Sequence, residues 1–248
     1  MILSTTTRTT LTGIGLASLL ATFGAHAGEL ITNGGFETGD FTTWSVYEAG
    51  TTGAVSVASG FVAPNSLKPT AGPASGNYYA LMDDPFTSAN ALIQTFSTGP
   101  VQSAVLSFNM FVNDHNPSGQ VFIDPSGLDA TTGGSFSPNQ HARVDLLTAS
   151  ASPFDTGAGV LKTFYLGGGT GRSFNNPYTG FDVADVLAMG GTFQLRFAEV
   201  NNQDFFNVGV DNVSLQVTPV PEASTWAMML AGLALTGLIT HRRRHALK

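Results

Sequence analysis

Hydrophobic and polar residues alternate along several short stretches of the chain, and this period of two is typical of β-strands with one buried face. In the clearest stretch, Leu106, Phe108, Met110 and Val112 share one face. Such stretches lie at residues 54–58, 78–82, 91–96, 104–112, 142–147, 160–166, 192–200 and 210–218. No long 3.6-residue period appears before the C-terminal end. The pattern predicts an all-β domain built as an antiparallel β-sandwich of two packed sheets.

Residues 1–27 have the features of a secretory signal peptide. Arg8 is their only charged residue, and residues 11–25 are apolar or small. Ala25-His26-Ala27 then places small residues at the two positions that a signal peptidase reads. A buried helix of the fold is the alternative, but the threonine-rich residues 5–10 offer it no amphipathic continuation. We therefore predict export, with cleavage before Gly28.

The C-terminal end combines an uncharged stretch with a basic cluster. Residues 223–240 carry no charge, and His241-Arg242-Arg243-Arg244-His245 follows them directly. A helix of this length just spans the hydrocarbon core of a bilayer, and basic residues beside a span stay on the cytoplasmic side. The sequence predicts a single transmembrane helix at 223–240 and a basic stop at 241–248, preceded by a rigid, accessible segment around Pro219 and Pro221.

This tail resembles the PEP-CTERM sorting signal of Gram-negative bacteria that make exopolysaccharide. The similar residues are Val220-Pro221-Glu222-Ala223-Ser224-Thr225-Trp226, the span that follows and the arginine stop. The third position of the motif is Ala223, where the family usually has proline. The resemblance assigns 219–248 to a sorting tail and implies an exosortase as partner, an inner-membrane intermediate and removal of the span. A plain C-terminal anchor that stays attached is the alternative.

The segment between the two ends is acidic and contains no cysteine. Residues 28–220 hold five basic and sixteen acidic side chains, a net charge of −11. An acidic surface repels phosphate backbones and anionic lipids, which argues against a nucleic-acid partner. Without disulfides, the stability of an exported domain must come from its core or from a bound metal.

Residues 28–218 resemble the jelly-roll β-sandwich of carbohydrate-binding modules. The opening Leu30-Ile31-Thr32-Asn33-Gly34-Gly35-Phe36-Glu37, followed by Trp44, is similar to their first strand. The closing Val210-Asp211-Asn212-Val213-Ser214-Leu215 is similar to their last. Residues 76–81 and 92–96 match two blocks between them, while 113–190 stays unmatched. The resemblance implies a jelly-roll fold, but many exported proteins share that fold without binding sugar.

In the resembled modules a structural calcium ion joins the first strand to the last. The corresponding residues here are Glu37 and Asp211. Asp211 has the parity of Val213 and Leu215, so we expect its carboxylate to point inward, where an unpaired charge is costly. A Ca²⁺ ion would neutralise both acids. The alternatives are that Glu37 caps a turn or that Asp211 pairs with an arginine.

Two groups of residues are candidates for ligand binding. Arg143 and Asp145 share one strand face and Arg196 lies on the polar face of another, where they would grip a polar ligand or pair with one another. Among the aromatic residues, Tyr78 and Tyr79 could stack on a sugar, although alternation allows at most one to point outward.

The residues that usually perform catalysis are sparse. Residues 28–220 contain two histidines, and no nucleophile elbow, zinc-binding helix or phosphate loop occurs. We therefore predict a non-catalytic protein of the cell surface or exopolysaccharide matrix. A carbohydrate-binding module is the second hypothesis. A hydrolase that uses carboxylates such as Asp83 and Asp84 is the third.

Overall fold

The structure is a computed structural model that describes residues 27–50, 54–115, 122–124, 127–130, 138–169, 175–221 and 223–246. The predicted signal peptide falls on residues outside this set, as do Glu222 of the sorting motif and much of the 113–140 connection. The chain divides into a β-domain up to Val220 and a separate C-terminal segment that begins at Pro221.

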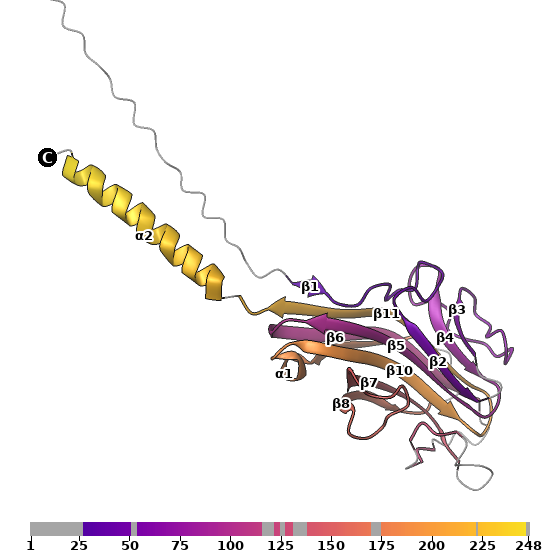
Figure 1. The fold of residues 1–248 in the computed structure, drawn as a ribbon. Helices are drawn as coiled ribbons and strands as arrows, with labels where there is room; N and C mark the ends of the chain where they lie inside the picture. The colour runs from indigo at the N-terminus through magenta and orange to yellow at the C-terminus, as the bar shows by residue number, and fades with distance from the viewer. Residues whose placement is uncertain are drawn as a thin grey trace, which may run out of the picture. The chain divides into compact units, whose positions relative to one another are not determined.

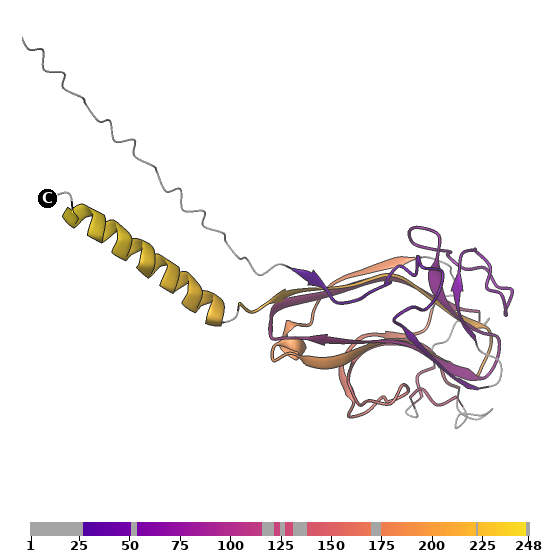
Figure 2. The same cartoon turned by 45° about the horizontal axis from the view of Figure 1, so that its top comes forward.

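The β-domain consists of two antiparallel sheets that face each other (Figures 1 and 2). The first has the strand order β3-β4-β11-β6-β9, with β1 also paired to β11, and the second has the order β2-β5-β10-β7-β8. The strands of the first sheet are β1 (Gly28–Glu29), β3 (Ala54–Ala58), β4 (Tyr79–Asp84), β6 (Val101–Asp114), β9 (Asn176–Asp182) and β11 (Phe206–Pro219). Those of the second are β2 (Ser45–Gly50), β5 (Ser88–Thr98), β7 (Gln140–Thr148), β8 (Val160–Gly167) and β10 (Gly191–Asn201). A short helix, α1 (Ala184–Leu187), precedes β10.

The alternating residues fill the space between the sheets. Leu106, Phe108 and Met110 from β6 lie in the same buried cluster as Phe197 from β10 and Leu215 from β11. The predicted antiparallel sandwich is therefore confirmed, and its two-sheet arrangement is consistent with a jelly roll. Phe108 stacks on Tyr178 with ring centroids 5.0 Å apart, which closes the edge of the sandwich at β9.

The eight predicted stretches all correspond to strands, but the pattern misses β1, β2 and β9. Each of these is an edge strand or is very short, so its side chains are too exposed to alternate clearly in hydrophobicity. Strand β1 is held by Glu29, whose carboxylate accepts hydrogen bonds from the backbone N–H of Leu215 at 2.7 Å and from the Gln216 amide at 2.8 Å. The predicted cleavage before Gly28 would leave this strand attached to β11.

The C-terminal segment forms helix α2 (Ala223–Ala246), as the sequence predicts. In the part of the chain that the structure describes, no helix combines the length and apolar character needed to cross a membrane. The transmembrane assignment of 223–240 is therefore not confirmed.

Candidate functional site

The parity of Asp211 in the sequence predicts a side chain that points between the sheets, but the structure shows the opposite orientation. Val210 and Val213 both lie in the core, although three positions apart, because β11 contains an irregularity between Asp211 and Ser214. Asn212 adopts a left-handed backbone with φ of 51°, which supplies the extra residue of a β-bulge. The bulge reverses the alternation, so Asp211 lies on the outer face of its sheet. The inward orientation was wrong, although Asp211 is still 1% exposed.

The residues that bury Asp211 come from the connection between β3 and β4. Its Oδ2 accepts hydrogen bonds from the backbone N–H groups of Ala74 at 2.8 Å and Ser75 at 3.0 Å. Glu37 Oε1 accepts equivalent bonds from Asn77 at 2.9 Å and Tyr78 at 3.0 Å. The two carboxylates therefore hold the same loop against the β1–β2 connection and β11.

Glu37 and Asp211 also approach each other. A Cβ on Gly35 would lie 3.8 Å from Asp211 Oδ1 and 3.8 Å from Glu37 Cγ. Burial raises the pKa of Asp211, and the nearby Glu37 charge raises it further. Two acids with an unfavourable mutual charge fit the ligand chemistry of Ca²⁺. The described residues contain no group of three or more His, Cys, Asp or Glu placed to hold a metal, so any ion here would rely on backbone and amide oxygens as well.

Arg143, Asp145 and Arg196 form one buried network on the outer face of the second sheet. Arg143 donates from Nε at 2.7 Å and from Nη2 at 2.8 Å to the two oxygens of Asp145. Arg196 lies directly opposite Asp145 in the strand register and donates from Nη2 at 2.5 Å. Thr163 completes the carboxylate shell at 2.7 Å. The sequence correctly groups these side chains, but the described contacts are to one another, which corresponds to the ion-paired alternative.

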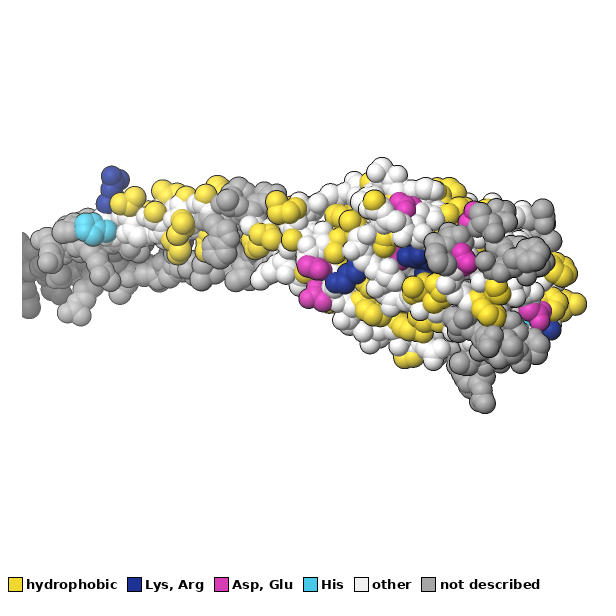
Figure 3. Space-filling view, turned by 90° about the horizontal axis from the view of Figure 1, so that it is seen from below, with side chains coloured by type: hydrophobic (Ala, Val, Ile, Leu, Met, Phe, Trp, Pro, Cys, Tyr) yellow, Lys and Arg dark blue, Asp and Glu magenta, His cyan; other side chains and the backbone are white. Residues whose placement is uncertain are grey.

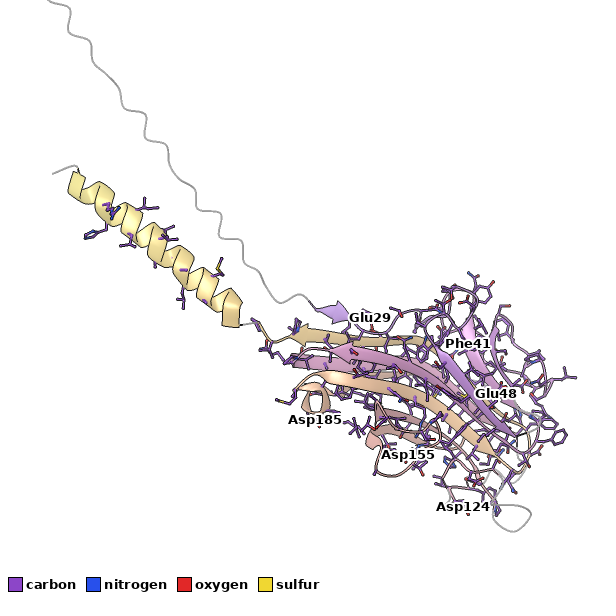
Figure 4. The ribbon with its side chains drawn as sticks, in the orientation of Figure 1. Glu29, Phe41, Glu48, Asp124, Asp155 and Asp185 are labelled. Carbon is purple, nitrogen blue, oxygen red and sulfur yellow. The ribbon has the colours of Figure 1, made fainter. Side chains whose placement is uncertain are left out.

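The network lies beneath the connection between β7 and β8. Arg196 Nη1 donates to the backbone carbonyls of Pro153 at 2.9 Å and Asp155 at 2.7 Å, and Asp155 lies on this connection (Figure 4). Beside it, Leu128 and Ala130 cover small apolar residues of β5 and β10. Loops therefore cover parts of this sheet face. Figure 3 shows few charged side chains on the molecule viewed from below.

Neither predicted tyrosine forms an open platform. Tyr79 is 1% exposed, and its hydroxyl donates to the carbonyl of Gly60 at 3.0 Å. Tyr78 is half-buried against the core. The expectation that the two side chains point to opposite faces agrees with this arrangement, since Tyr79 packs with Phe111 outside the first sheet.

Three exposed apolar side chains, Phe61, Val62 and Leu67, lie instead on a flap, residues 59–72, that folds over the outer face of the first sheet. Phe61 is 66% exposed and Leu67 is 75% exposed. Buried Asp83 holds the flap by accepting hydrogen bonds from the backbone N–H of Asn65 at 2.6 Å and Ser66 at 3.1 Å. Leu67 has a left-handed backbone with φ of 56°, a conformation that is unfavourable for leucine. The fold thus uses a buried charge and a strained residue to present an apolar surface.

The flap reaches the end of the sandwich that carries the β4–β5 and β10–β11 turns. The Lys68 ammonium lies 4.2 Å from the centroid of the Phe205 ring, and that ring is 6.3 Å from the ring of Phe86. Phe86 is 63% exposed. Strand β11 begins here at Phe206 and ends at Pro219, so the chain leaves the β-domain at the opposite end of that strand. The sequence could not reveal the flap, because its residues have no regular period.

Several solved structures are similar to this chain, each with low sequence identity. It is 15% identical to a carbohydrate-binding module, TmCBM61, solved in complex with β-1,4-galactotriose, with a TM-score of 0.44 over 76% of this chain and 97% of that one. A carbohydrate-binding module of the β-sandwich superfamily is 13% identical, with a TM-score of 0.41 over 73% and 60%. The Stig cyclase Fisc from Fischerella sp. TAU is 18% identical, with a TM-score of 0.39 over 79% and 100%. No curated protein matches the sequence.

The C-terminal end matches a family description directly. Residues 219–244 match the PEP-CTERM protein-sorting motif. The match begins at the last residue of β11 and includes most of helix α2. The chain therefore carries a PEP-CTERM sorting signal immediately after its β-sandwich.

Proposed function

We propose that this chain is an exported, non-catalytic protein of the cell surface or exopolysaccharide matrix of a Gram-negative bacterium. The PEP-CTERM match at 219–244, directly after the folded β-domain, carries the proposal. The signal would direct the chain to an exosortase-type enzyme while residues 223–240 hold it in the inner membrane. Processing would then release the sandwich to the surface or matrix.

The intact mass of the exported protein tests this proposal. Cleavage before Gly28 and near Pro221 leaves a species close to residues 28–220. Replacing Pro221 and Glu222 with alanine should cause the unprocessed form to accumulate, whereas the same double change at exposed Ser97 and half-buried Thr98 should not. Finding residues 226–248 still attached in the final location would make the tail an ordinary anchor.

A structural calcium ion at Glu37 and Asp211 forms part of the same proposal. It is supported by the approach of two acids around Gly35, where the β1–β2 connection meets β11. The ion would bind carboxylate oxygens that the backbone N–H groups of residues 74–78 leave available, and would stabilise the loop that these groups belong to.

Binding to extracellular polysaccharide is the second candidate, and the position of Phe61 favours it. A Cβ on Gly72 would lie 2.5 Å from the Phe61 ring, so that ring packs directly on the glycine backbone while most of the side chain stays exposed. A ring supported in this way can stack on a sugar with little loss of side-chain entropy. Gly72 also has a positive φ of 71°, which favours glycine at this position.

A comparison of Phe61→Ser with the wild type separates the two candidates. If the flap binds glycans, the variant should lose binding to the polysaccharide of the host, while exposed Leu161→Ser on β8 should retain it. We expect millimolar or weaker affinity for simple neutral oligosaccharides, because Tyr78, Tyr79, Arg143, Asp145 and Arg196 are occupied by contacts within the domain. A micromolar constant from titration calorimetry would make carbohydrate binding the leading function.

A carboxylate-dependent hydrolase is the third candidate and has the least support. Asp83 and Asp84 are neighbours on β4, so their side chains point to opposite faces of the sheet. Asp83 binds the flap, whereas Asp84 lies between the sheets with Asn90. These two acids cannot act together on one glycosidic bond. Release of reducing ends from the polysaccharide of the host would revive this candidate.

A further inference from the structure

Two carboxylic side chains meet inside the sandwich, where neither the sorting signal nor the flap uses them. Asp84 comes from β4 and Glu199 from β10, so the pair joins the two sheets. The Asn90 amide on β5 donates to Asp84 Oδ1 at 2.6 Å and to Glu199 Oε1 at 3.3 Å. All three residues are 0% exposed.

Within the described part of the chain, the second oxygen of each acid has no hydrogen-bond partner. Asp84 Oδ2 and Glu199 Oε2 are both buried and unsatisfied in the absence of a proton between the carboxyl groups. One proton shared by the two groups would convert two unfavourable oxygens into a donor and an acceptor. The alternative, two buried negative charges side by side, is far more costly.

Among the residues that the structure describes, no cationic side chain faces the pair from the elements packed against it. On β4, Asp83 adds a further negative charge, and Asp114 of β6 lies in the same strand row as Asp84, beyond Phe206. Apart from Glu199 itself, the charged residues of β7 and β10, including His141, Arg143 and Arg196, alternate to the outer face of their sheet. Glu48 of β2 lies opposite Asn90, but it is exposed and accepts from the Val55 backbone. On β11, Asp211 points outward, and β5 has no charged residue.

We propose that Asp84 and Glu199 form a proton-binding site that holds one proton between the sheets and thereby fastens the end of the sandwich that carries Phe86. Burial first, and the adjacent acid second, raises the pKa of Glu199, and burial raises the pKa of Asp84 to about 7. A folded state that keeps a proton which the unfolded chain has lost becomes less stable as the pH rises.

The connection to this end of the sandwich runs through Asn201, two residues after Glu199 on the same strand face. Its Nδ2 lies 3.2 Å from the carbonyl of Asp84 and 3.1 Å from that of Phe86, so it joins β10 to the β4–β5 turn. Separation of two ionised carboxylates would pull on both strands at this point. Loss of the proton should therefore loosen residues 84–90 before it affects the rest of the domain.

The sign of the effect follows from proton binding. An unfolded aspartate or glutamate loses its proton near pH 4, whereas the folded pair keeps one to pH 7 or above. Stability is therefore greatest at acidic pH and falls as the pH rises through the folded pKa values. For each proton difference, the folding equilibrium constant falls about tenfold per pH unit. Above about pH 7.5 histidines are nearly all neutral in both states, so the pair dominates the change.

Urea unfolding of the purified exported protein between pH 7.5 and 9 tests the proposal. The wild type should lose stability across this range. Glu199→Gln should remove the slope, because glutamine donates permanently to Asp84 as the protonated acid does. Asp84→Asn provides the same test if Glu199→Gln does not fold. Asp83→Asn is the matched control, since it should weaken the flap and retain the slope.

Hydrogen exchange gives a local readout on the same samples. Amides of residues 84–90 should exchange faster at pH 9 than at pH 7.5, after correction for intrinsic rates, in the wild type and not in Glu199→Gln. A flat wild-type stability profile, or equal slopes in the wild type and both variants, would overturn the proposal. Restoration of wild-type stability at pH 8.5 by Ca²⁺, absent in Glu199→Gln, would also overturn it by showing that the pair binds a cation.

Discussion

Asp145 and Arg196 lie opposite each other on adjacent strands, with Oδ2 and Nη2 2.5 Å apart and both side chains completely buried. Burial lowers the pKa of the Arg196 guanidinium, while the Asp145 charge raises it. The same carboxylate also binds Arg143, so one buried negative charge serves two guanidinium groups. This arrangement makes Asp145 the residue on which the outer face of the second sheet depends.

Asp145→Asn should therefore destabilise the domain severely. Asparagine keeps the shape of the side chain but leaves two largely buried arginines without a counter-charge, which costs about 3–5 kcal/mol. Urea unfolding at pH 7 measures the loss. Lys162→Ala is the control, because the Lys162–Asp185 pair is exposed and such pairs contribute at most about 1 kcal/mol. Equal losses in the two variants would contradict the role of the network.

Gly34→Ala should disrupt the contact between the β1–β2 connection and β11. A Cβ on Gly34 would lie 1.9 Å from the backbone oxygen of Val213, and the Gly34 carbonyl accepts from the Val213 N–H at 2.9 Å. The backbones must separate and lose this bond, at a cost of about 2–4 kcal/mol. Gly60→Ala is the control, because no atom lies within 4 Å of its Cβ position. An unchanged unfolding midpoint for Gly34→Ala would show that the backbones of residues 34 and 213 do not approach so closely.

The sandwich was predictable because central strands such as β10 keep a period of two over most of their length. Phe193, Leu195 and Phe197 face the core as the pattern requires, since each is flanked by strands that bury the same face. Edge strands such as β9 lack this constraint, and their exposed faces tolerate any residue. Strand positions in the middle of a sheet can thus be read from the sequence more readily than those at its edges.

The candidate site was less predictable, because it depends on interruptions of the pattern. The sequence groups Glu37 with Asp211 through a resemblance, and they do lie close together. The orientation of Asp211 depends on the left-handed conformation of Asn212, which alternation cannot anticipate. The pairing of Asp84 with Glu199 joins residues of different sheets, and only the folded topology brings them together.

His141 should make the domain less stable in mild acid. Burial, followed by the Arg143 charge, lowers its pKa to about 4, while an unfolded histidine titrates near 6.5. The unfolded chain therefore binds one more proton between these values, and stability falls as the pH drops from about 6.5 to 4. The loss due to His141 reaches about 3 kcal/mol.

Comparison with His141→Gln isolates this contribution. The Asp84–Glu199 pair acts in the opposite direction over the same pH range, so only the difference between wild type and variant is informative. The stability of the wild type relative to His141→Gln should fall on acidification. A constant difference from pH 7 to 4 would show that His141 is accessible to protons in the folded state.

Calcium should stabilise the domain through Glu37 and Asp211. If the two acids share an ion, calcium at a hundredfold excess over its dissociation constant adds about 2.7 kcal/mol. A chelator should then lower the melting temperature by several degrees, and Asp211→Asn should abolish that sensitivity. Asp40→Asn is the control, because the Asp40 carboxylate accepts hydrogen bonds from Thr38 and Thr42 of its own turn. Because Asp211 also holds Ala74 and Ser75, its variant should be less stable than the wild type even without calcium. An unchanged melting curve in chelator, with no calcium found by elemental analysis, would mean that the backbone N–H groups alone stabilise these carboxylates.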